Sequence, residues 1–221
     1  MKSSLLEIDS LLYTLKSKVV LRHINFRVET GDILLILGRN GAGKSTLFKS
    51  IFGTIKPDQR FVRIDGIVKA NPFEIENGIS YSTHYCHLPE NKTVKQLIDL
   101  YINDQNTKEL LYKNEVLVYI LNQKLKELSF GIKSYVQTLL YLYDSSKFCL
   151  LDEPFASLSP LLAEKILDLI VVQSKSKGII ISDHQFENVF EVATKKYVLS
   201  KGKLIPVENR NDLIESGYIN Q

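Results

Sequence analysis

The feature that most constrains the fold is a glycine-rich loop, GRNGAGKS (38–45), which directly follows the apolar run ILLIL (33–37). The spacing GxxxxGK[ST] is typical of a loop that joins a strand to the N-terminus of a helix. A short apolar run without polar alternation is typical of a strand buried on both faces of a parallel sheet. We therefore expect a mainly parallel α/β fold, with the helix after this loop spanning 44–52.

Other segments continue the alternation of strands and helices. Apolar runs at 148–151 and 178–182 predict two further buried strands. Helical patterns predict helices over 129–143 and from Pro160 to about residue 174, where Ser159 is the expected N-cap. Alternating elements of this kind favour an α/β core.

Two regions are expected to lie outside this alternation. The first thirty residues show short strands joined by polar turns, which predicts an antiparallel β flank. A small helical lobe is expected at about 93–143, because no strand is predicted between 93 and 128 and apolar residues recur there at helical spacing. We expect one domain over 1–221, with a core of 1–84 and 145–221 and a final hairpin and short helix. The residues expected to line one helix face are Leu110, Leu111, Leu117, Val118, Leu121 and Leu125.

Charge and cysteine content narrow the functional classes. The 28 Lys and Arg against 25 Asp and Glu leave a net charge of only +3, so no nucleic-acid partner is expected. Cys86 and Cys149 have no CxxC spacing, which argues against a zinc site or a disulfide and favours a reducing compartment. No apolar run approaches the length of a membrane span or a signal peptide, so we expect a soluble chain.

The glycine-rich loop is expected to bind phosphate. Backbone N–H groups of such a loop and the positive end of the following helix surround phosphate oxygens. Lys44 would neutralise the β and γ phosphates, and the Ser45 hydroxyl would bind Mg²⁺. The alternative is a β-to-α turn without a ligand. The residues predicted to bind the nucleotide here are Gly38, Arg39, Asn40, Gly41, Ala42, Gly43, Lys44, Ser45 and Thr46.

A carboxylate pair follows the second apolar run, in FCLLDEP (148–154). Asp152 would stand at the carboxyl end of its strand and hold Mg²⁺ through water, while Glu153 would polarise an attacking water. Strand ends often carry solvated acids, so the pair alone does not indicate a nucleotide site. It does so only in combination with the phosphate loop.

Together these motifs resemble the nucleotide-binding subunit of an ABC transporter over nearly the whole chain. LGRNGAGKST resembles the Walker A motif, and LLDEP followed by FASLSP resembles Walker B and the D-loop. The resemblance implies that His184, in IISDHQFENV, is the switch histidine that contacts the γ-phosphate; the alternative is a solvated loop histidine. It also implies that Tyr13 stacks on adenine, the alternative being a half-buried strand tyrosine.

The sequence LSFGIK (128–133) stands where this family has its signature, which contacts ATP bound to the opposite subunit. The resemblance implies that Ser129 and Gly131 face that phosphate, although Ser129 would also serve as an ordinary helix N-cap. Phe130 replaces the first glycine of the usual signature, and Ile132 replaces its glutamine.

Two more positions depart from the family. Alignment of ISYSTH places His84 where a glutamine normally contacts Mg²⁺ and the attacking water; the alternative is a displaced loop with His84 in solvent. Ser159 stands where the D-loop normally has Asp.

The resemblance implies an ATPase that uses ATP and Mg²⁺, with Glu153 as general base, His184 as γ-phosphate sensor, and Lys44 and His84 in the catalytic site. It implies two partners: a second copy or a related ATPase subunit, and a membrane-spanning subunit. The chain would then be cytoplasmic, peripheral at the inner face of the membrane. The expected docking surface comprises 81–92 and the surface around the helical lobe, with Tyr85, His87 and Leu88 as its apolar part.

Two alternative functions remain open. One is a regulatory ATP-binding module with weak hydrolysis, because His84, Phe130 and Ser159 depart from the family pattern. The other is a soluble ABC protein that acts on DNA or ribosomes, which the single phosphate loop and the low net charge disfavour. These motifs do not specify a cargo or a direction of transport.

Overall fold

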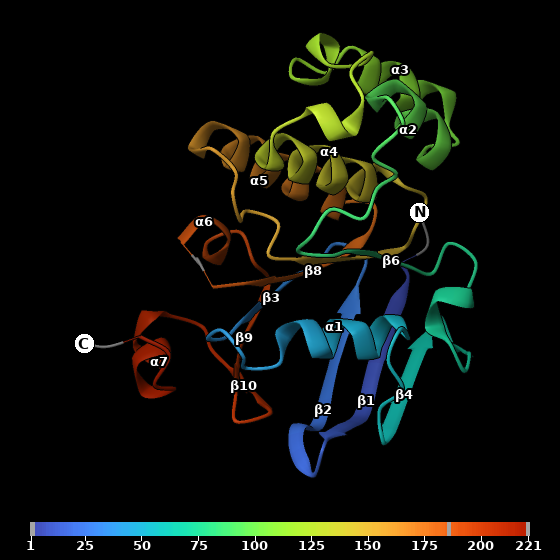
Figure 1. Ribbon diagram of the computed structural model, residues 1–221. Helices are drawn as coiled ribbons and strands as arrows, with labels where there is room; N and C mark the ends of the chain where they lie inside the picture. The colour runs from blue at the N-terminus through green and yellow to red at the C-terminus, as the bar shows by residue number, and fades with distance from the viewer. Residues whose placement is uncertain (1–2, 185–186, 220–221) are drawn as a thin grey trace.

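The computed structural model describes residues 3–184 and 187–219, which form two β-sheets with helices around them (Figure 1). The larger sheet has the strand order β10-β9-β3-β8-β7-β6. Every pair of neighbouring strands in this sheet is parallel except the pair β9–β10, which is antiparallel. This arrangement confirms the expected mainly parallel sheet. Its strands are β3 (Ile33–Leu37), β6 (Ile79–Ser82), β7 (Phe148–Asp152), β8 (Gly178–Asp183), β9 (Lys195–Ser200) and β10 (Lys203–Pro206).

The smaller sheet is antiparallel, with the order β2-β1-β4-β5. It confirms the predicted antiparallel flank, although the first thirty residues form two long strands with register shifts instead of several short ones. Its strands are β1 (Leu5–Leu15), β2 (Lys18–Glu29), β4 (Gln59–Ile64) and β5 (Ile67–Val68).

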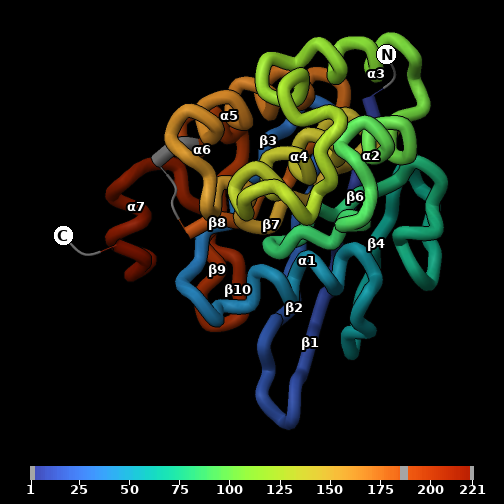
Figure 2. Tube along the Cα trace, turned by 45° about the horizontal axis from the view of Figure 1, so that its top comes forward, coloured from blue at the N-terminus to red at the C-terminus, as the bar shows by residue number. Residues whose placement is uncertain are grey.

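Helix α1 lies on one side of the larger sheet, and α4 and α5 lie on the other (Figure 1). Helices α2 and α3 lie at the opposite end of the molecule from the β1–β2 hairpin (Figure 2). The predicted helices after the phosphate loop, before β7 and before β8 are confirmed. The helices are α1 (Lys44–Phe52), α2 (Val94–Tyr101), α3 (Gln105–Tyr112), α4 (Phe130–Tyr143), α5 (Pro160–Ser174), α6 (Glu187–Phe190) and α7 (Arg210–Glu215), with 3-10 turns η1 (Pro72–Glu74), η2 (Leu117–Tyr119) and η3 (Leu125–Glu127).

The larger sheet separates two hydrophobic cores. On β3, Leu34 and Ile36 pack into the core shared with α1 and the antiparallel sheet. The residues between and after them, Leu35 and Leu37, pack into the core shared with α4 and α5. Both faces of the strand are therefore buried, and this burial explains its continuous apolar sequence.

The predicted single helix face between residues 93 and 128 is wrong. Helix α3 ends at Tyr112, and the Asn114 side chain then accepts hydrogen bonds from the amides of Val116 and Leu117. This local capping starts a new turn and interrupts the helical spacing. As a result Leu117 is buried, while Leu110 is 51% exposed.

Within residues 3–184 and 187–219, no helix combines the length and the apolar character that a membrane span requires.

Candidate functional site

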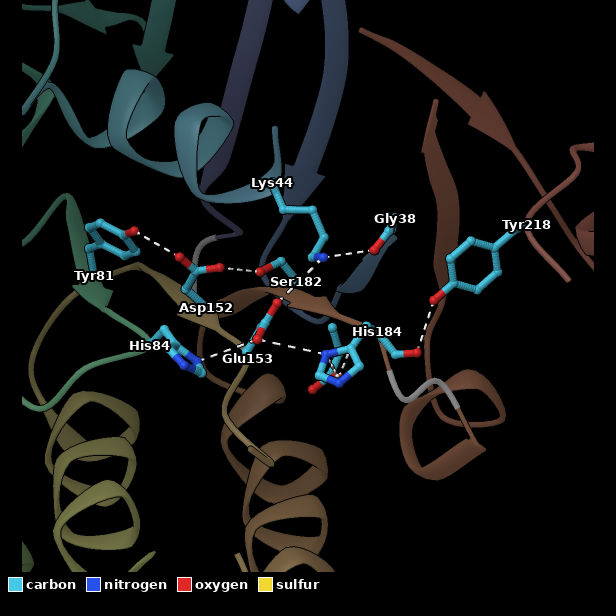
Figure 3. A network of polar contacts seen from close by, with 10 residues as sticks. Gly38, Lys44, Tyr81, His84, Asp152, Glu153, Ser182, His184 and Tyr218 are labelled. Carbon is cyan, nitrogen blue, oxygen red and sulfur yellow. Dashed lines mark hydrogen bonds and ion pairs between the residues drawn. The ribbon is translucent and has the colours of Figure 1, made fainter. Parts of the chain in front are cut away.

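The candidate site lies where the loops after β3, β7 and β8 meet. These three strands are parallel neighbours, so their carboxyl ends lie at the same edge of the sheet. Lys44 follows β3, Glu153 follows β7 and His184 follows β8. Figure 3 shows the three side chains converging on one point.

The glycine-rich loop leaves the N-terminus of α1 open. Gly43 adopts a left-handed conformation (φ 107°) at the N-cap, and no side chain in the described part of the chain caps the helix. Lys44 is 5% exposed, and its Nζ donates to the carbonyl oxygen of Gly38 at 2.7 Å. This ammonium is therefore held over the loop, beside uncapped helix amides.

A cavity of about 1260 Å³ lies against this loop. Its volume and its combination of backbone amides with one buried ammonium suit a nucleoside triphosphate. Described residues that line it are Leu15, Ser17, Lys18, Val19, Val20, Arg22, Asn40, Gly41, Ala42, Gly43, Lys44, Ser45, Thr46, Glu153, Lys201 and Gly202.

Asp152 is fixed in place by two hydroxyl groups. It is 4% exposed and accepts hydrogen bonds from the Tyr81 hydroxyl, at 3.0 Å, and from the Ser182 hydroxyl. Burial, together with the charge of Asp152 and the hydrogen bond to it, raises the pKa of Tyr81. Tyr81 is therefore a phenol that donates to the carboxylate.

These residues also fit a magnesium ion that a nucleotide brings with it. Among the described residues there is no group of three or more His, Cys, Asp or Glu side chains that would hold a metal by itself. Mg²⁺ typically takes one or two protein oxygens and completes its shell with phosphate and water. Ser45 lines the cavity, and the fixed carboxylate of Asp152 supplies the oxygens that such an ion prefers.

Glu153 stands among three basic side chains (Figure 3). Its carboxylate lies 3.4 Å from Lys44 Nζ, 3.4 Å from His84 Nδ1 and 3.7 Å from His184 Nδ1. Its backbone has a positive φ of 54°, and its amide donates to the carbonyl of Ser182 at 2.8 Å. A left-handed non-glycine residue stores strain that the surrounding structure must hold.

The loop that carries His84 is held by Gln137 of α4, a residue that the sequence analysis did not identify. Gln137 is 3% exposed. Its amide group donates to the Ser82 hydroxyl at 3.2 Å and to the Thr83 carbonyl at 2.8 Å, and it accepts from the His87 amide at 2.9 Å. His84 therefore does not lie in a displaced, solvated loop.

Tyr13 lies outside the cavity, whereas Leu15, two residues further on, lines it and is 52% exposed. Tyr13 packs half-buried against the core on the α1 side of the sheet. A register shift between Tyr13 and Thr14 interrupts the strand alternation that would otherwise place Tyr13 and Leu15 on the same face. Leu15, near the β1–β2 turn, is therefore the apolar side chain that this strand presents to the cavity. Leu15 was not predicted here, because the resemblance implied an aromatic residue at this place.

Arg39 also has a different position from the one expected. Its guanidinium turns away from the cavity and donates to the carbonyl oxygen of Gly217 at 2.9 Å. Arg39 lines a second recess, of about 240 Å³, on the outer side of the phosphate loop. The residue is part of the loop, but its side chain joins the loop to the segment after α7.

The signature-like residues of the chain lie apart from its own phosphate loop. Ser129 is exposed and caps α4 by accepting from the Ile132 amide at 3.4 Å. Neither Ser129 nor Gly131 is among the described residues that line the large cavity. Gly131 packs against the loop after β7, where a Cβ atom would meet the carbonyl oxygen of Ser157. Phe130 is 43% exposed beside them.

Ser159 is confirmed as the N-cap of α5, since its hydroxyl accepts from the Leu162 amide at 3.4 Å. Pro160 follows at the first helical position. This geometry explains how the segment tolerates Ser at the position where the resemblance leads us to expect Asp.

The expected docking surface is only partly exposed. Tyr85 is 65% exposed, but Leu88 is 3% exposed and belongs to the core, so its expected surface role is wrong. A second cavity, of about 600 Å³, lies beside this loop. Its described lining residues are Lys49, Phe52, Thr54, Ile55, Ile79, Ser80, Tyr81, Thr83, His87 and Tyr141.

Comparison with known proteins identifies the family. Residues 21–156 match the ABC transporter family. The chain is 30% identical over 220 residues to the xylose/arabinose import ATP-binding protein of Sulfolobus acidocaldarius, covering 92% of this chain and 87% of the relative. It is 28% identical over 221 residues to the lipopolysaccharide export system ATP-binding protein of Haemophilus influenzae, covering 91% of this chain and 89% of the relative.

A solved structure of the ATP-binding subunit of an ABC transporter shares the fold, with a TM-score of 0.85 at 24% identity, over 98% of this chain and 95% of that one. A bacterial Atm1-family ABC exporter with ATP bound gives a TM-score of 0.83 at 19% identity, over 97% of this chain and 40% of that one. The site geometry and these matches agree: the chain belongs to the ABC transporter family, among its ATP-binding cassettes.

Proposed function

We propose that this chain is an ATP-hydrolysing subunit that powers a separately encoded membrane subunit through ATP-driven closure of a dimer. The observation that carries the proposal is the convergence of Lys44, His84 and His184 on Glu153, beside a cavity lined by the phosphate loop. ATP is the substrate, and a bound Mg²⁺ would supply charge neutralisation at its phosphates.

The protein side chains divide the chemistry among them. Glu153 is the general base that accepts a proton from the attacking water. Lys44 neutralises phosphate charge, and His184 contacts the γ-phosphate from the end of β8. Asp152 and Ser45 would hold the magnesium ion that accompanies the nucleotide. His84, at 3.4 Å from Glu153, orients the base.

A second copy of the chain, or a related subunit, completes the site. Ser129 is exposed at the N-terminus of α4, which has 14 residues and no acidic side chain in its first turn. This helix end would face the nucleotide held by the other subunit, with Gly131 allowing its close packing. Because the two subunits exchange the same contacts, closure would bury two nucleotides.

The membrane subunit would dock at the second cavity. This cavity combines apolar side chains, such as Phe52 and Ile55, with the loop that carries His84. Such mixed apolar and polar lining suits a helix end from a partner. The chain would then lie at the cytoplasmic face of the membrane as one domain, whose helical lobe spans about 93–143 and whose core comprises 1–84 and 145–221.

The first experiment measures the mass of the Glu153→Gln protein in solution, by light scattering with and without Mg-ATP. Blocked hydrolysis should trap the closed dimer, so we expect the mass to double with Mg-ATP. The Ser129→Arg change in the same background should return the mass to that of a monomer. A Glu153→Gln protein that binds ATP and stays monomeric would contradict dimer closure.

Two observations favour a regulatory module with weak hydrolysis as the second candidate. Leu15 offers a base a smaller contact than an aromatic ring would, and Phe130 is 43% exposed within the signature-like sequence. Steady-state phosphate release decides between the two functions. Turnover that Glu153→Gln abolishes supports the transport ATPase, whereas tight ATP binding without Glu153-dependent turnover supports the regulatory module.

A further inference from the structure

The turn that follows α7 contacts two parts of the nucleotide site that are far apart in sequence. The Tyr218 hydroxyl donates to the backbone carbonyl oxygen of His184 at 2.9 Å. One residue earlier, the Gly217 carbonyl accepts from the guanidinium of Arg39 in the phosphate loop, also at 2.9 Å. Figure 3 shows Tyr218 reaching the end of β8 from the side opposite His84.

Local hydrogen bonds at both ends of α7 fix the position of this turn. Asn209 caps α7 by accepting from the amides of Asn211 and Asp212. At the other end, Gly217 has a left-handed φ of 69°, and the Tyr218 amide donates to the carbonyl of Leu213 at 3.0 Å. A glycine in this conformation is the usual way to end a helix.

The turn is also tied to the core. Leu213 is fully buried, and Tyr218 packs against the same core as α4 and α5. The position of the Tyr218 hydroxyl is therefore set by the fold, independently of any nucleotide.

His184 depends on its backbone for its position. Its side chain is 39% exposed, so packing alone constrains the ring weakly. Its backbone is held at both polar groups: the amide donates to the Asp183 carboxylate at 2.7 Å, and the carbonyl accepts from Tyr218. The imidazole lies 3.7 Å from Glu153. A small rotation of this backbone would move the ring relative to the base.

We infer that Tyr218 is a positioning residue for His184, and that the turn 216–219 aligns the end of β8 with the phosphate loop through Arg39. This inference rests on the proposed function for the role of His184. It assigns the segment after α7 a part in turnover. None of the described residues that line the nucleotide cavity comes from that segment.

The test compares the parent protein with Tyr218→Phe, His184→Ala and the double variant. Removal of one hydroxyl should lower kcat about fivefold, the effect of one lost hydrogen bond, and leave the Kd for ATP unchanged. In the His184→Ala background the same change should have no further effect, because the residue it positions is gone. Tyr119→Phe, at a side chain 82% exposed, is the matched control and should keep the parent kcat.

Two kinetic outcomes would overturn the inference. One is a Tyr218→Phe protein that turns over as fast as the parent. The other is a double variant whose loss is the product of the two single losses, since independent effects multiply. A merely structural tyrosine would give the second result.

A separate measurement distinguishes failure of this inference from failure of the proposed function. If Glu153→Gln does not reduce turnover, the proposed function fails, and amide hydrogen exchange then decides the inference. Tyr218→Phe should speed exchange in the peptide 178–184, and Arg39→Met should speed exchange in 38–43 and in 213–219. Unchanged exchange in all three peptides would contradict the inference.

Discussion

A Cβ atom added to Gly131 would lie 2.5 Å from the carbonyl oxygen of Ser157. The start of α4 and the loop after β7 are therefore in direct contact, and only glycine permits this approach. Ser157 itself has a left-handed backbone, with φ 66°, so the loop has little freedom to retreat. The contact links the signature-like sequence to the loop that carries Glu153.

Gly131→Ala should destabilise the protein by about 1–3 kcal/mol, because the new methyl group forces the backbone apart. We also expect loss of the ATP-driven dimer in the Glu153→Gln background. Urea unfolding and light scattering measure the two effects. Unfolding at the parent urea concentration would show that the loop accommodates the methyl group.

Gln137→Leu should lower ATP turnover while leaving ATP binding close to that of the parent. The change keeps the volume of the side chain and removes its three hydrogen bonds to β6 and the His84 loop, which leaves the partly buried Thr83 carbonyl and His87 amide without this partner. Steady-state kinetics and a fluorescent ATP titration separate the two quantities. Equal losses in kcat and in ATP affinity would point to a general disturbance of the fold.

Lys177→Met should lower the free energy of unfolding by about 3–5 kcal/mol, because it leaves a largely buried carboxylate without its cationic partner. Lys177 Nζ lies 3.0 Å from Asp144 Oδ1, and their side chains are 4% and 17% exposed. Urea denaturation measures the change.

Lys165→Met is the matched control for this pair. Lys165 pairs with Glu115, whose side chain is 69% exposed, and such surface pairs contribute at most about 1 kcal/mol. Similar losses for the two variants would contradict the distinction between the buried and the exposed pair.

Cys149 should resist thiol reagents in the folded protein at pH 8 and react readily in urea. Complete burial raises the pKa of its thiol from 9.0 to about 12, so almost no thiolate forms at that pH. Above pH 9 the unfolded thiol loses its proton before the folded one, so this group lowers stability as pH rises from 9 towards 12. Cys149→Ala should flatten this part of the stability profile, measured by urea unfolding between pH 8 and pH 10.

Short local patterns were sufficient to predict the main elements and part of the site. The strand ILLIL and the helix over 44–52 follow from apolar runs and from the glycine-rich loop between them. Ser129 and Ser159 were predicted as caps because a cap depends on residues within one turn. The same patterns predicted the family.

Contacts between segments distant in the sequence were beyond such patterns. Gln137 reaches its loop across 50 to 55 positions, and Tyr218 reaches His184 across 34. Leu15 was missed because a register shift between Tyr13 and Thr14, which the local sequence pattern does not reveal, decides which side chain near the β1–β2 turn faces the cavity. The failure at Leu110 has a local cause, since the cap at Asn114 broke the helical spacing on which the prediction relied.

The burial of β3, β7 and β8 on both faces has a consequence for strand alignment. A strand with only one apolar face cannot slip by one residue, because the slip would expose its buried side chains. In these strands both faces are apolar, so a slip by one residue would still place apolar side chains in both cores. Their alignment must be fixed elsewhere, and the hydroxyl groups of Tyr81 and Ser182, from the two strands that flank β7, meet on Asp152 in one register only. The polar residues at this edge thus also set the register of β7 against β6 and β8.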